Sequence, residues 1–458
     1  MSAHPSLFPS TTQNIPATFS WREKGVGKMQ NHILDVVLAD NPWLEGTSLA
    51  QWFSDHLPDP YLPRRLRLEP TTRACLVVGP RQAGKSTLIW KTLADLGRPA
   101  LFLDCEEPAI REWLSSPALF LADVARLGER PAALFLEEVP RLPEAGLTIK
   151  GLVDRRPGLP IYATGSSSFD LEDESRESLA GRADRHLLLP LSLAEAVGPL
   201  PAAPALAERQ LAELVGRLAV HGSYPAVLLA STPEREIAGL VEAFVIRDAS
   251  DRLKVQRLPA FRKVLALAAS QVGNLCNYSE WAALCSISND TVDDYVHLLE
   301  ETHVLRTVPP FVGGKRAEIT RARKVFFLDN GLRNQLFGGF ASLDGRADRG
   351  ALLENLMFSE ITKNINPLLD ALHYWRSKSG AEVDFVLEHR GELLAVEVKS
   401  ACRDGRPSRS AASFIDAYHP AVFVLVSKGS PGESSSGATR VRLVRPWEVA
   451  GVVQEFVS

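Results

Sequence analysis

Gly79-Pro-Arg-Gln-Ala-Gly-Lys-Ser-Thr87 is the stretch that decides the fold of the first half of this chain. It fits the pattern GxxxxGK[ST], follows an apolar run that begins at Ala74, and precedes a helical pattern from Leu88 onward. Glycines let backbone N–H groups converge on phosphate oxygens, and the amino terminus of a helix adds positive potential. Strand, loop and helix together predict a site for a nucleoside triphosphate, which we expect to be ATP with Mg²⁺.

Each residue type in this phosphate loop has a chemical role. Lys85 is expected to reach the β- and γ-phosphates, and the hydroxyl of Ser86 is expected to ligate Mg²⁺. The other positions expected to surround the nucleotide are Gly79, Pro80, Arg81, Gln82, Ala83, Gly84 and Thr87.

Short apolar runs alternate with helical patterns on both sides of the loop. The runs begin at Ala74, Ala100, Ala133, Pro160 and His186. Buried strands joined by helices form a parallel sheet. The sequence therefore predicts an α/β core over residues 71–200. Residues 1–70 form a lead-in with expected helices at 29–39 and 49–56.

Four more residues are candidates for work on the nucleotide. The third run ends with Glu137, where an aspartate commonly holds the Mg²⁺ shell, and with Glu138, placed as the base for attacking water. Glu137 is one methylene longer than aspartate, so the hydrolysis rate stays open. Ser166, after the fourth run, could sense the γ-phosphate or belong to a serine-rich turn. Arg182, before the fifth run, could be an arginine finger that contacts the ATP of a neighbouring subunit, or it could be a solvated loop residue.

Residues 201–335 are mostly helical in pattern. Residues 279–299 indicate a helix, a tight turn and a second helix, with Asn289 or Asp290 expected as its cap. Strands expected at 304–308 and 324–328 complete a winged-helix pattern. Such helices usually read DNA, but phosphates would repel the acidic residues of this second helix, so we expect it to have a structural or protein-docking use.

The segment after that helix is basic. A basic wing could bind the phosphates of the DNA backbone regardless of base sequence, or it could be a solvated surface. Its basic residues are Lys315, Arg316, Arg321, Arg323 and Lys324, with Glu318 as the single acid.

Residues 336–458 contain a second cluster with a predicted chemistry. A helix is expected at 352–368 and two strands at 381–387 and 392–399. The period of two in strands places Glu397 and Lys399 on one face, and the hairpin can bring Asp384 to that face. Two carboxylates with a divalent metal and a lysine beside the attacking water can cleave a phosphodiester, and Glu354 could complete the site. The alternative is an exposed hairpin edge with alternating charges.

Composition limits the classes of function. The net charge of −4 on 458 residues means that any nucleic-acid contact must come from a local basic surface. The five cysteines are scattered and odd in number, which favours reduced thiols in a cytosolic compartment. Nowhere do 18 consecutive apolar residues occur, so we expect an unanchored cytoplasmic protein.

In these motifs the chain resembles the prokaryotic AAA-type ATPases that join a P-loop core to a carboxy-terminal domain of unknown function. Further motifs that carry the resemblance are Leu136-Glu-Glu-Val, Thr164-Gly-Ser-Ser, Ser178-Leu-Ala-Gly-Arg, Gly222-Ser-Tyr-Pro, Phe327-Leu-Asp-Asn-Gly-Leu, Glu354-Asn, Tyr374-Trp-Arg, Glu382-Val-Asp-Phe-Val and Val396-Glu-Val-Lys. The resemblance implies an AAA+-like core, a winged helix and a domain similar to the PD-(D/E)XK (restriction-endonuclease-like) nuclease fold. It implies nuclease-site roles for Glu354, Asp384, Glu397 and Lys399.

Two hypotheses for function follow. In the first, the core hydrolyses ATP and the chain acts on DNA, which the carboxy-terminal cluster binds and cuts with Mg²⁺. In the second, the chain is a nucleotide-controlled switch that binds a protein partner, and its nuclease-like domain is inactive. A homo-oligomer is compatible with both.

Overall fold

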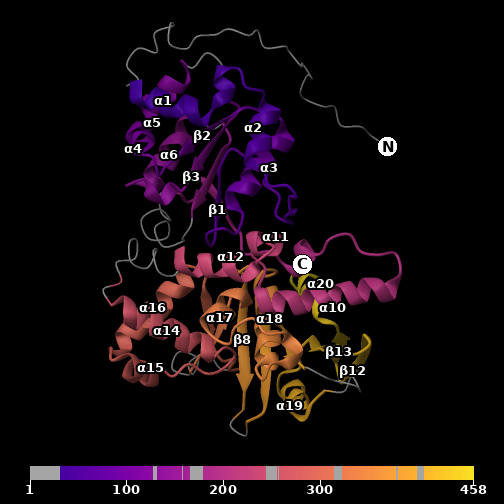
Figure 1. Cartoon of the computed structure of the whole chain (residues 1–458). Helices are drawn as coiled ribbons and strands as arrows, with labels where there is room; N and C mark the ends of the chain where they lie inside the picture. Colours follow the sequence, from indigo (N-terminus) through magenta and orange to yellow (C-terminus); the bar gives the residue numbers. More distant parts are fainter. Residues whose placement is uncertain are drawn as a thin grey trace.

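The computed structural model has two lobes, stacked one above the other in Figure 1. The upper lobe contains the predicted α/β core, and the lower lobe contains the rest of the chain. The structure describes residues 31–126, 131–156, 158–165, 179–243, 255, 257–313, 322–377, 380–399 and 407–458.

A five-stranded parallel sheet in the order β2-β3-β4-β1-β5 forms the upper lobe and confirms the predicted α/β core. Its strands are β1 (Ala74–Val78), β2 (Ala100–Asp104), β3 (Ala133–Glu137), β4 (Ile161–Gly165) and β5 (Ala183–Leu187). Its helices are α1 (Asn31–Asp40), η1 (Pro42–Glu45), α2 (Leu49–His56), α3 (Lys85–Leu96), α4 (Pro108–Leu114), α5 (Pro117–Val124), η2 (Val139–Arg141) and α6 (Ala145–Arg155). The apolar residues of strands and helices form one buried cluster.

One strand differs from its prediction. β5 begins at Ala183, three residues before the apolar run that was expected to form it. It is an edge strand that pairs with β1 alone, and most of its residues are partly exposed. An edge strand can carry polar residues such as Asp184, so the apolar run does not mark its start.

The opposite edge of the sheet, β2, is covered by the segment between α1 and η1. The Asn41 side-chain carbonyl accepts from the backbone N–H of Phe102 at 2.7 Å, and its amide donates to the Phe102 carbonyl at 2.9 Å. These are the two bonds that a neighbouring strand would make. The lead-in is therefore a structural part of the upper lobe, because it satisfies backbone groups that an open edge would expose.

The lower lobe begins with helices and a small two-stranded antiparallel sheet. They are α9 (Leu193–Ala196), α10 (Pro204–His221), α11 (Pro225–Leu229), α12 (Pro233–Leu240), α14 (Leu258–Ser270), α15 (Tyr278–Cys285), α16 (Asn289–Glu301), β6 (Leu305–Val308) and β7 (Lys324–Phe327). The expected cap of α16 was wrong by one or two residues: the hydroxyl of Ser288 accepts from the N–H of Thr291 at 3.1 Å. Ser288 has the extended backbone that an N-cap requires.

A six-stranded mixed sheet in the order β12-β13-β11-β10-β9-β8 occupies the rest of the lower lobe. Its elements are α17 (Asn330–Leu336), η4 (Leu343–Gly345), α18 (Arg349–Thr362), β8 (Asp370–Arg376), β9 (Glu382–His389), β10 (Glu392–Val398), α19 (Arg409–Tyr418), β11 (Val422–Val426), β12 (Gly432–Ser436), β13 (Thr439–Val444), η5 (Pro446–Glu448) and α20 (Val449–Val457). α18 ends at Thr362, six residues before its predicted end at residue 368. Pro367 disfavours helix at residue 366, so the helix does not continue to the predicted end.

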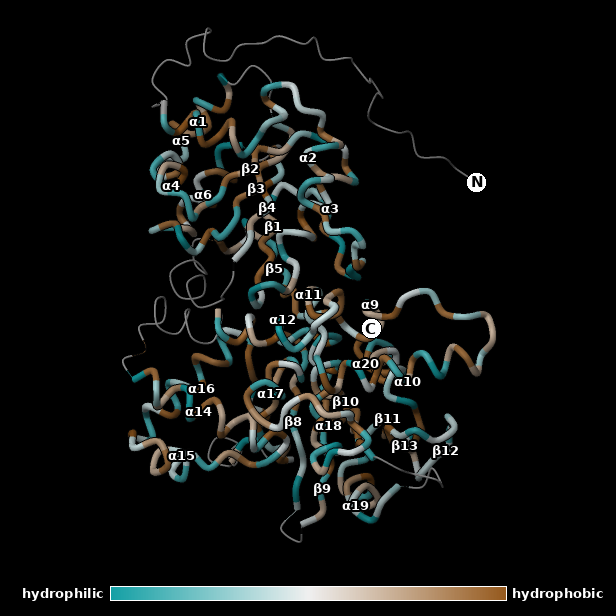
Figure 2. The backbone as a smooth tube through the Cα atoms, viewed as in Figure 1, coloured by the Kyte–Doolittle hydropathy of each residue, from teal (hydrophilic) through white to brown (hydrophobic). Residues whose placement is uncertain are grey.

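The helical part and the mixed sheet of the lower lobe share one apolar core. Side chains from α10, α14, β7, α18 and β10 belong to the same buried cluster, while α19 and the other sheet face form a smaller one. Figure 2 shows hydrophobic stretches in both lobes. The domain boundary expected near residue 335 stays a prediction. No helix in the described parts of the chain is both long and apolar enough to cross a membrane.

Candidate functional site

The phosphate loop joins β1 to α3, and its backbone needs glycine at two positions. Gly79 has a φ of +147°, and a Cβ added there would lie 2.2 Å from the carbonyl oxygen of Leu188, where the chain leaves β5. Gly84 has a φ of +91° and stands at the N-cap of α3. Any side chain at Gly79 would collide with backbone, so the loop conformation depends on it.

Lys85 is buried at the first residue of α3. Its ammonium donates to the carbonyl oxygens of Gly79, at 3.1 Å, and Pro80, at 2.9 Å. A bound triphosphate would offer charged acceptors, which form stronger hydrogen bonds than these neutral carbonyls. The loop therefore holds the lysine in place beside the positions where phosphates would bind.

Ser86 and Glu137 meet at the carboxyl end of the sheet. The Ser86 hydroxyl hydrogen-bonds to the Glu137 carboxylate. Burial raises the pKa of Glu137 to about 7, the hydrogen bond from Ser86 lowers it, and the neighbouring charge of Glu138 raises it further. A hydroxyl and a carboxylate oxygen at one point are donors that Mg²⁺ accepts, so these two residues fit the expected metal.

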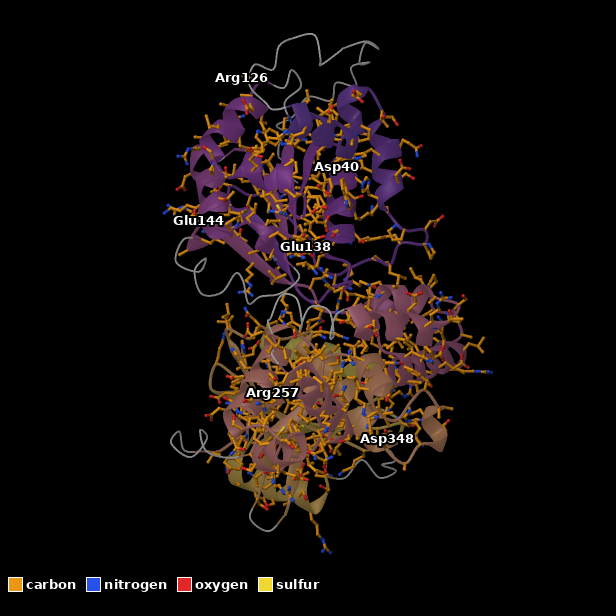
Figure 3. All side chains as sticks on the ribbon, turned by 60° about the vertical axis from the view of Figure 1, so that its left-hand side comes forward. Asp40, Arg126, Glu138, Glu144, Arg257 and Asp348 are labelled. Carbon is orange, nitrogen blue, oxygen red and sulfur yellow. The ribbon has the colours of Figure 1, made fainter. Side chains whose placement is uncertain are left out.

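Glu138 follows β3 directly, and its position is fixed by its backbone. Its φ of +51° is in the left-handed region, and its N–H donates to the hydroxyl of Thr164 at 3.0 Å. β4 lies between β1 and β3, so Thr164, near its carboxyl end, lies between the phosphate loop and Glu138. Figure 3 shows Glu138 at the end of the upper lobe nearest the lower lobe.

Thr164 is a candidate site residue whose hydrogen bond with the Glu138 backbone was not expected from the sequence. The available signal was its place at the end of the fourth apolar run, where the expected sensing hydroxyl was assigned to Ser166 instead. Ser166 lies outside the described residues.

Arg182 lies at the other end of the sheet. Its Nε is 2.7 Å from the Asp154 carboxylate on α6, and its carbonyl accepts from the N–H of Ala74 at the start of β1. A five-residue strand spans roughly 16 Å, so this arginine cannot reach the phosphate loop of its own chain. Any contact with ATP would have to be with that of a neighbouring subunit.

The lower lobe meets the phosphate loop at the turn between α10 and α11. A Cβ placed on Gly84 would lie 3.8 Å from Cγ of Pro225. The same turn is bound to the lower lobe by Asp329, a fully buried carboxylate that accepts from the N–H of Ser223 at 2.7 Å and of Gly331 at 2.8 Å. Residues 223–225 therefore lie between the phosphate loop and the buried core of the lower lobe.

The four predicted nuclease-site residues come together in the lower lobe. Asp384 on β9 accepts from the N–H of Val398 at 2.6 Å, which places it beside Glu397 on β10. Lys399 has its Nζ 2.7 Å from Glu397, whose two oxygens also accept from the hydroxyl of Ser408 at 3.0 and 3.2 Å. The predicted arrangement on one strand face is thus present in the structure.

Two further residues belong to this cluster, and sequence reasoning missed their roles. Lys324, the first residue of β7, has its Nζ 3.2 Å from the Glu354 carboxylate and forms an ion pair with Glu382. Its side chain is 4% exposed. The assignment of Lys324 to a basic wing for DNA phosphates was wrong, because the side chain is buried against carboxylates. Arg323 is exposed; Lys315, Arg316 and Arg321 lie outside the described residues.

Burial controls the protonation of the cluster. It raises the pKa of Glu354 to about 8, an effect strengthened by the Asp384 charge and opposed by Lys324. It also raises the pKa of Asp384 to about 6, opposed by the hydrogen bond from the Val398 N–H. Burial alone would lower the pKa of Lys324, but the surrounding carboxylates raise it overall.

This arrangement does not fit a divalent metal. Mg²⁺ needs several oxygen ligands with free lone pairs directed at one point. Here hydrogen bonds and ammonium groups engage the carboxylates of Glu354, Asp384 and Glu397. Within the ranges that the structure describes, no three His, Cys, Asp or Glu side chains are placed to hold a metal ion.

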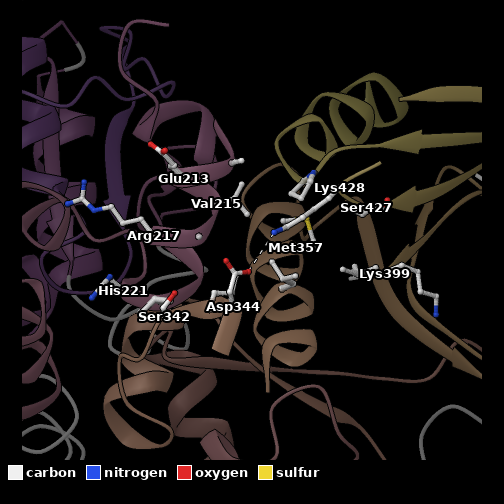
Figure 4. Close-up of a pocket in the computed structure, with 18 of the residues that line it drawn as sticks. Glu213, Val215, Arg217, His221, Ser342, Asp344, Met357, Lys399, Ser427 and Lys428 are labelled. Carbon is white, nitrogen blue, oxygen red and sulfur yellow. Dashed lines mark ion pairs between the residues drawn. The ribbon is translucent and has the colours of Figure 1, made fainter. Parts of the chain in front are cut away.

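A cavity of about 640 Å³ lies beside the cluster, between α10, α18 and the carboxyl ends of β10 and β11 (Figure 4). Val215 and Met357 contribute apolar side chains to its wall, and Lys428 pairs with Asp344 across its edge at 3.9 Å. Lys399 also lines it, and 44% of its side chain is exposed. A ligand could therefore reach this lysine from solvent.

The phosphate loop, the Ser86–Glu137 pair and the five-stranded parallel sheet all lie within residues 71–197. Residues 71–197 match the family described as AAA domain. Residues 212–343 match Domain of unknown function (DUF8612), and residues 349–441 match Domain of unknown function (DUF4143).

Relatives align over much of the chain. The Uncharacterized protein Rv2008c of Mycobacterium tuberculosis is 29% identical over 344 residues, covering 73% of this chain and 71% of the relative. An Uncharacterized protein of Haemophilus influenzae is 28% identical over 247 residues, covering 52% of this chain and 58% of the relative.

Solved structures with partial likeness include a branch migration motor and a replication initiator. The Thermotoga maritima RuvB Holliday junction branch migration motor is 14% identical, covering 61% of this chain and 90% of that one, with a TM-score of 0.26. The replication initiator DnaA bound to AMPPCP and single-stranded DNA is 14% identical, covering 50% and 83%, with a TM-score of 0.24. Scores of this size carry no argument about function.

Proposed function

We propose that the protein binds and hydrolyses ATP in the upper lobe. The observation that supports this most is the meeting of Ser86 and Glu137 beside Lys85, with Glu138 as the next residue. The site therefore combines a cation for the phosphates (Lys85), two oxygen ligands for Mg²⁺ (Ser86 and Glu137) and a carboxylate for the attacking water (Glu138).

In this proposal each side chain has one task. Lys85 leaves the loop carbonyls and binds the β- and γ-phosphates, which neutralises charge that develops during transfer. Ser86 and Glu137 would hold Mg²⁺, which supplies further charge neutralisation at the phosphate oxygens. Glu138 orients the attacking water and accepts its proton, and the Thr164 hydroxyl fixes the backbone from which Glu138 projects.

The test is phosphate release by the purified full-length chain with ATP, with and without Mg²⁺. Lys85→Ala should abolish both tight ATP binding and phosphate release. Lys91→Ala is the matched control, because Lys91 is on the same helix and forms an ion pair with exposed Asp95. Unchanged activity in Lys85→Ala would refute the proposal.

For the lower lobe we propose a nucleotide-controlled switch that docks a protein partner and does not cut DNA. The supporting observation is that ammonium groups engage the carboxylates of the nuclease-like cluster. The acidic residues on α16 also disfavour DNA in that position. The contact of Pro225 with the phosphate loop offers a route by which bound ATP could change this lobe.

Action on DNA is the second candidate, and one observation favours it. Arg262 and Lys263 on α14 and Arg323 before β7 are exposed on one part of the lower lobe, the helix-and-hairpin unit formed by α14, α15, α16, β6 and β7. Such residues could hold backbone phosphates without reading bases. The deciding measurement is the ATPase rate with single-stranded, duplex and branched DNA across a salt series. Stimulation that weakens steeply with salt supports DNA, and no stimulation supports the protein-partner switch.

A further inference from the structure

Lys324 is an unusual residue for the place it occupies. It begins β7 in the helix-and-hairpin unit, yet its ammonium lies among carboxylates that project from α18 and β9 of the mixed-sheet part. The Tyr374 ring covers it, with its centroid 5.6 Å from Nζ. Two parts of the lower lobe that are far apart in sequence therefore meet at this one charge.

Electrostatics explains why a cation is needed here. Glu354, Glu382, Asp384 and Glu397 bring four carboxylates together, and Lys324 and Lys399 bring two ammonium groups. Ionised carboxylates that are buried close together are unfavourable without a cation, so the ionised cluster requires positive charge. Lys399, whose side chain is 44% exposed, pairs with Glu397, whereas Lys324, whose side chain is 4% exposed, is the buried ammonium group of the cluster.

We infer that Lys324 is the resident cation of this cluster and takes the place that the divalent metal expected from the sequence would occupy. A lysine ammonium gives three donors and one charge. It satisfies Glu354 and Glu382 and attracts Asp384, but it cannot polarise water as a divalent ion does. The domain therefore keeps a nuclease-like acid cluster as a structural ion-pair centre, and Lys324 excludes metal from it.

Removal of the ammonium tests the inference directly. Lys324→Met keeps an apolar stem beside Tyr374 but removes the ammonium group that lies among Glu354, Glu382 and Asp384, while Arg376 stays 3.8 Å from Glu382 and Lys399 stays beside Glu397. Nucleotide-free full-length chain is titrated with Mn²⁺ and with Mg²⁺, by calorimetry and by thermal unfolding. The wild-type chain should show no saturable site. Lys324→Met should bind one ion, and its Tm should rise by several degrees at metal concentrations far above Kd.

Two controls make the result specific. Lys363→Met breaks another buried lysine–glutamate pair, with Glu360 at 3.3 Å, and should lose stability without gaining a metal site. Adding Asp384→Asn to Lys324→Met should remove the acquired site. If Lys324→Met does not fold, Lys324→Gln takes its place.

Either of two results would overturn the inference. One is saturable Mn²⁺ binding by the wild-type chain that Asp384→Asn abolishes. The other is a folded Lys324 variant, with ATP affinity unchanged, that binds no metal. Neither result depends on whether the upper lobe hydrolyses ATP.

Discussion

The hydroxyl of Ser86 hydrogen-bonds to the carboxylate of Glu137, joining the phosphate loop to the end of β3. Glu137 is largely buried there, and its pKa is raised to about 7 chiefly by burial. A carboxyl that holds its proton up to neutral pH can donate or accept in this bond. It must lose that proton before it can serve a metal.

The first prediction concerns the pH dependence of ATP binding. Because Mg²⁺ requires the ionised Glu137, affinity for ATP with Mg²⁺ should rise with pH up to about 7 and then level off. At pH 6 it should be roughly tenfold weaker than at pH 8. Calorimetry in buffers of different ionisation enthalpy should detect proton release on binding near pH 6.

The control is Glu137→Gln, which has no titrating group at this position. Its ATP affinity should be lower overall, and whatever pH dependence remains belongs to the nucleotide. Equal pH dependence in both proteins would show that Glu137 does not contact the metal. Glu137→Asp should bind ATP, and its rate shows whether the longer side chain limits hydrolysis.

Ionisation of Glu137 should lower the free energy of unfolding, although it should strengthen the binding of ATP with Mg²⁺. A carboxyl whose pKa is raised on folding binds more protons in the native than in the unfolded state between pH 4.5 and about 7. The free energy of unfolding of the nucleotide-free chain should therefore fall as pH rises through this window and stay flat above it. Denaturant unfolding at several pH values should show this fall in the wild type and a weaker one in Glu137→Gln.

Glu138→Gln should separate binding from hydrolysis. The amide keeps the size of the side chain and the backbone bond to Thr164, but it cannot accept a proton from water. ATP affinity should stay within a few-fold of wild type, while phosphate release should fall about 10²- to 10⁴-fold. Glu144→Gln, an exposed change close by, is the control for general effects. A rate near wild type would remove Glu138 from the mechanism.

Much of the upper lobe could be predicted because its signals are local. The loop from Gly79 to Ser86 has a fixed pattern, and the central strands are short apolar runs with clear ends. The start of β5 could not be predicted, because an edge strand lacks such a run. The cap at Ser288 failed for a related reason, since three consecutive residues there can all cap a helix.

The lower-lobe cluster shows a different limit. The pairing of Asp384 with Glu397 follows from strand period and a hairpin, and both are readable in sequence. The burial of Lys324 is not, because it depends on how the β6–β7 hairpin packs against α18 and β9, tens of residues away. A run of charged residues usually predicts an exposed segment, but tertiary packing buries Lys324.

Gly222 should tolerate no side chain. Its φ is +78°, and an added Cβ would lie 2.0 Å from an oxygen of the Asp329 carboxylate, which binds the turn. Gly222→Ala should therefore destabilise the lower lobe by on the order of 3–5 kcal/mol, measured by denaturant unfolding. Gly216→Ala is the matched control, because this glycine inside α10 has open space and should gain roughly 0.5–1 kcal/mol. Similar small effects in both would mean that the turn readily rearranges.

The last prediction tests whether Arg182 acts across a subunit boundary. It lies one strand length from its own phosphate loop, so a catalytic role requires a neighbour's ATP. Arg182→Ala should then lower the rate of phosphate release at least tenfold without weakening ATP binding. Asp154→Ala removes the partner of Arg182 and leaves the arginine, so it should keep most of the activity if the ion pair is only structural.

Mixing Arg182→Ala with Lys85→Ala gives some pairs in which one chain binds ATP and the other supplies the arginine. A rate of phosphate release above the sum of the rates of the two variants supports an arginine finger that acts on the ATP of the neighbouring subunit. Additive activity in a mixed oligomer would instead assign Arg182 to its surface pair with Asp154.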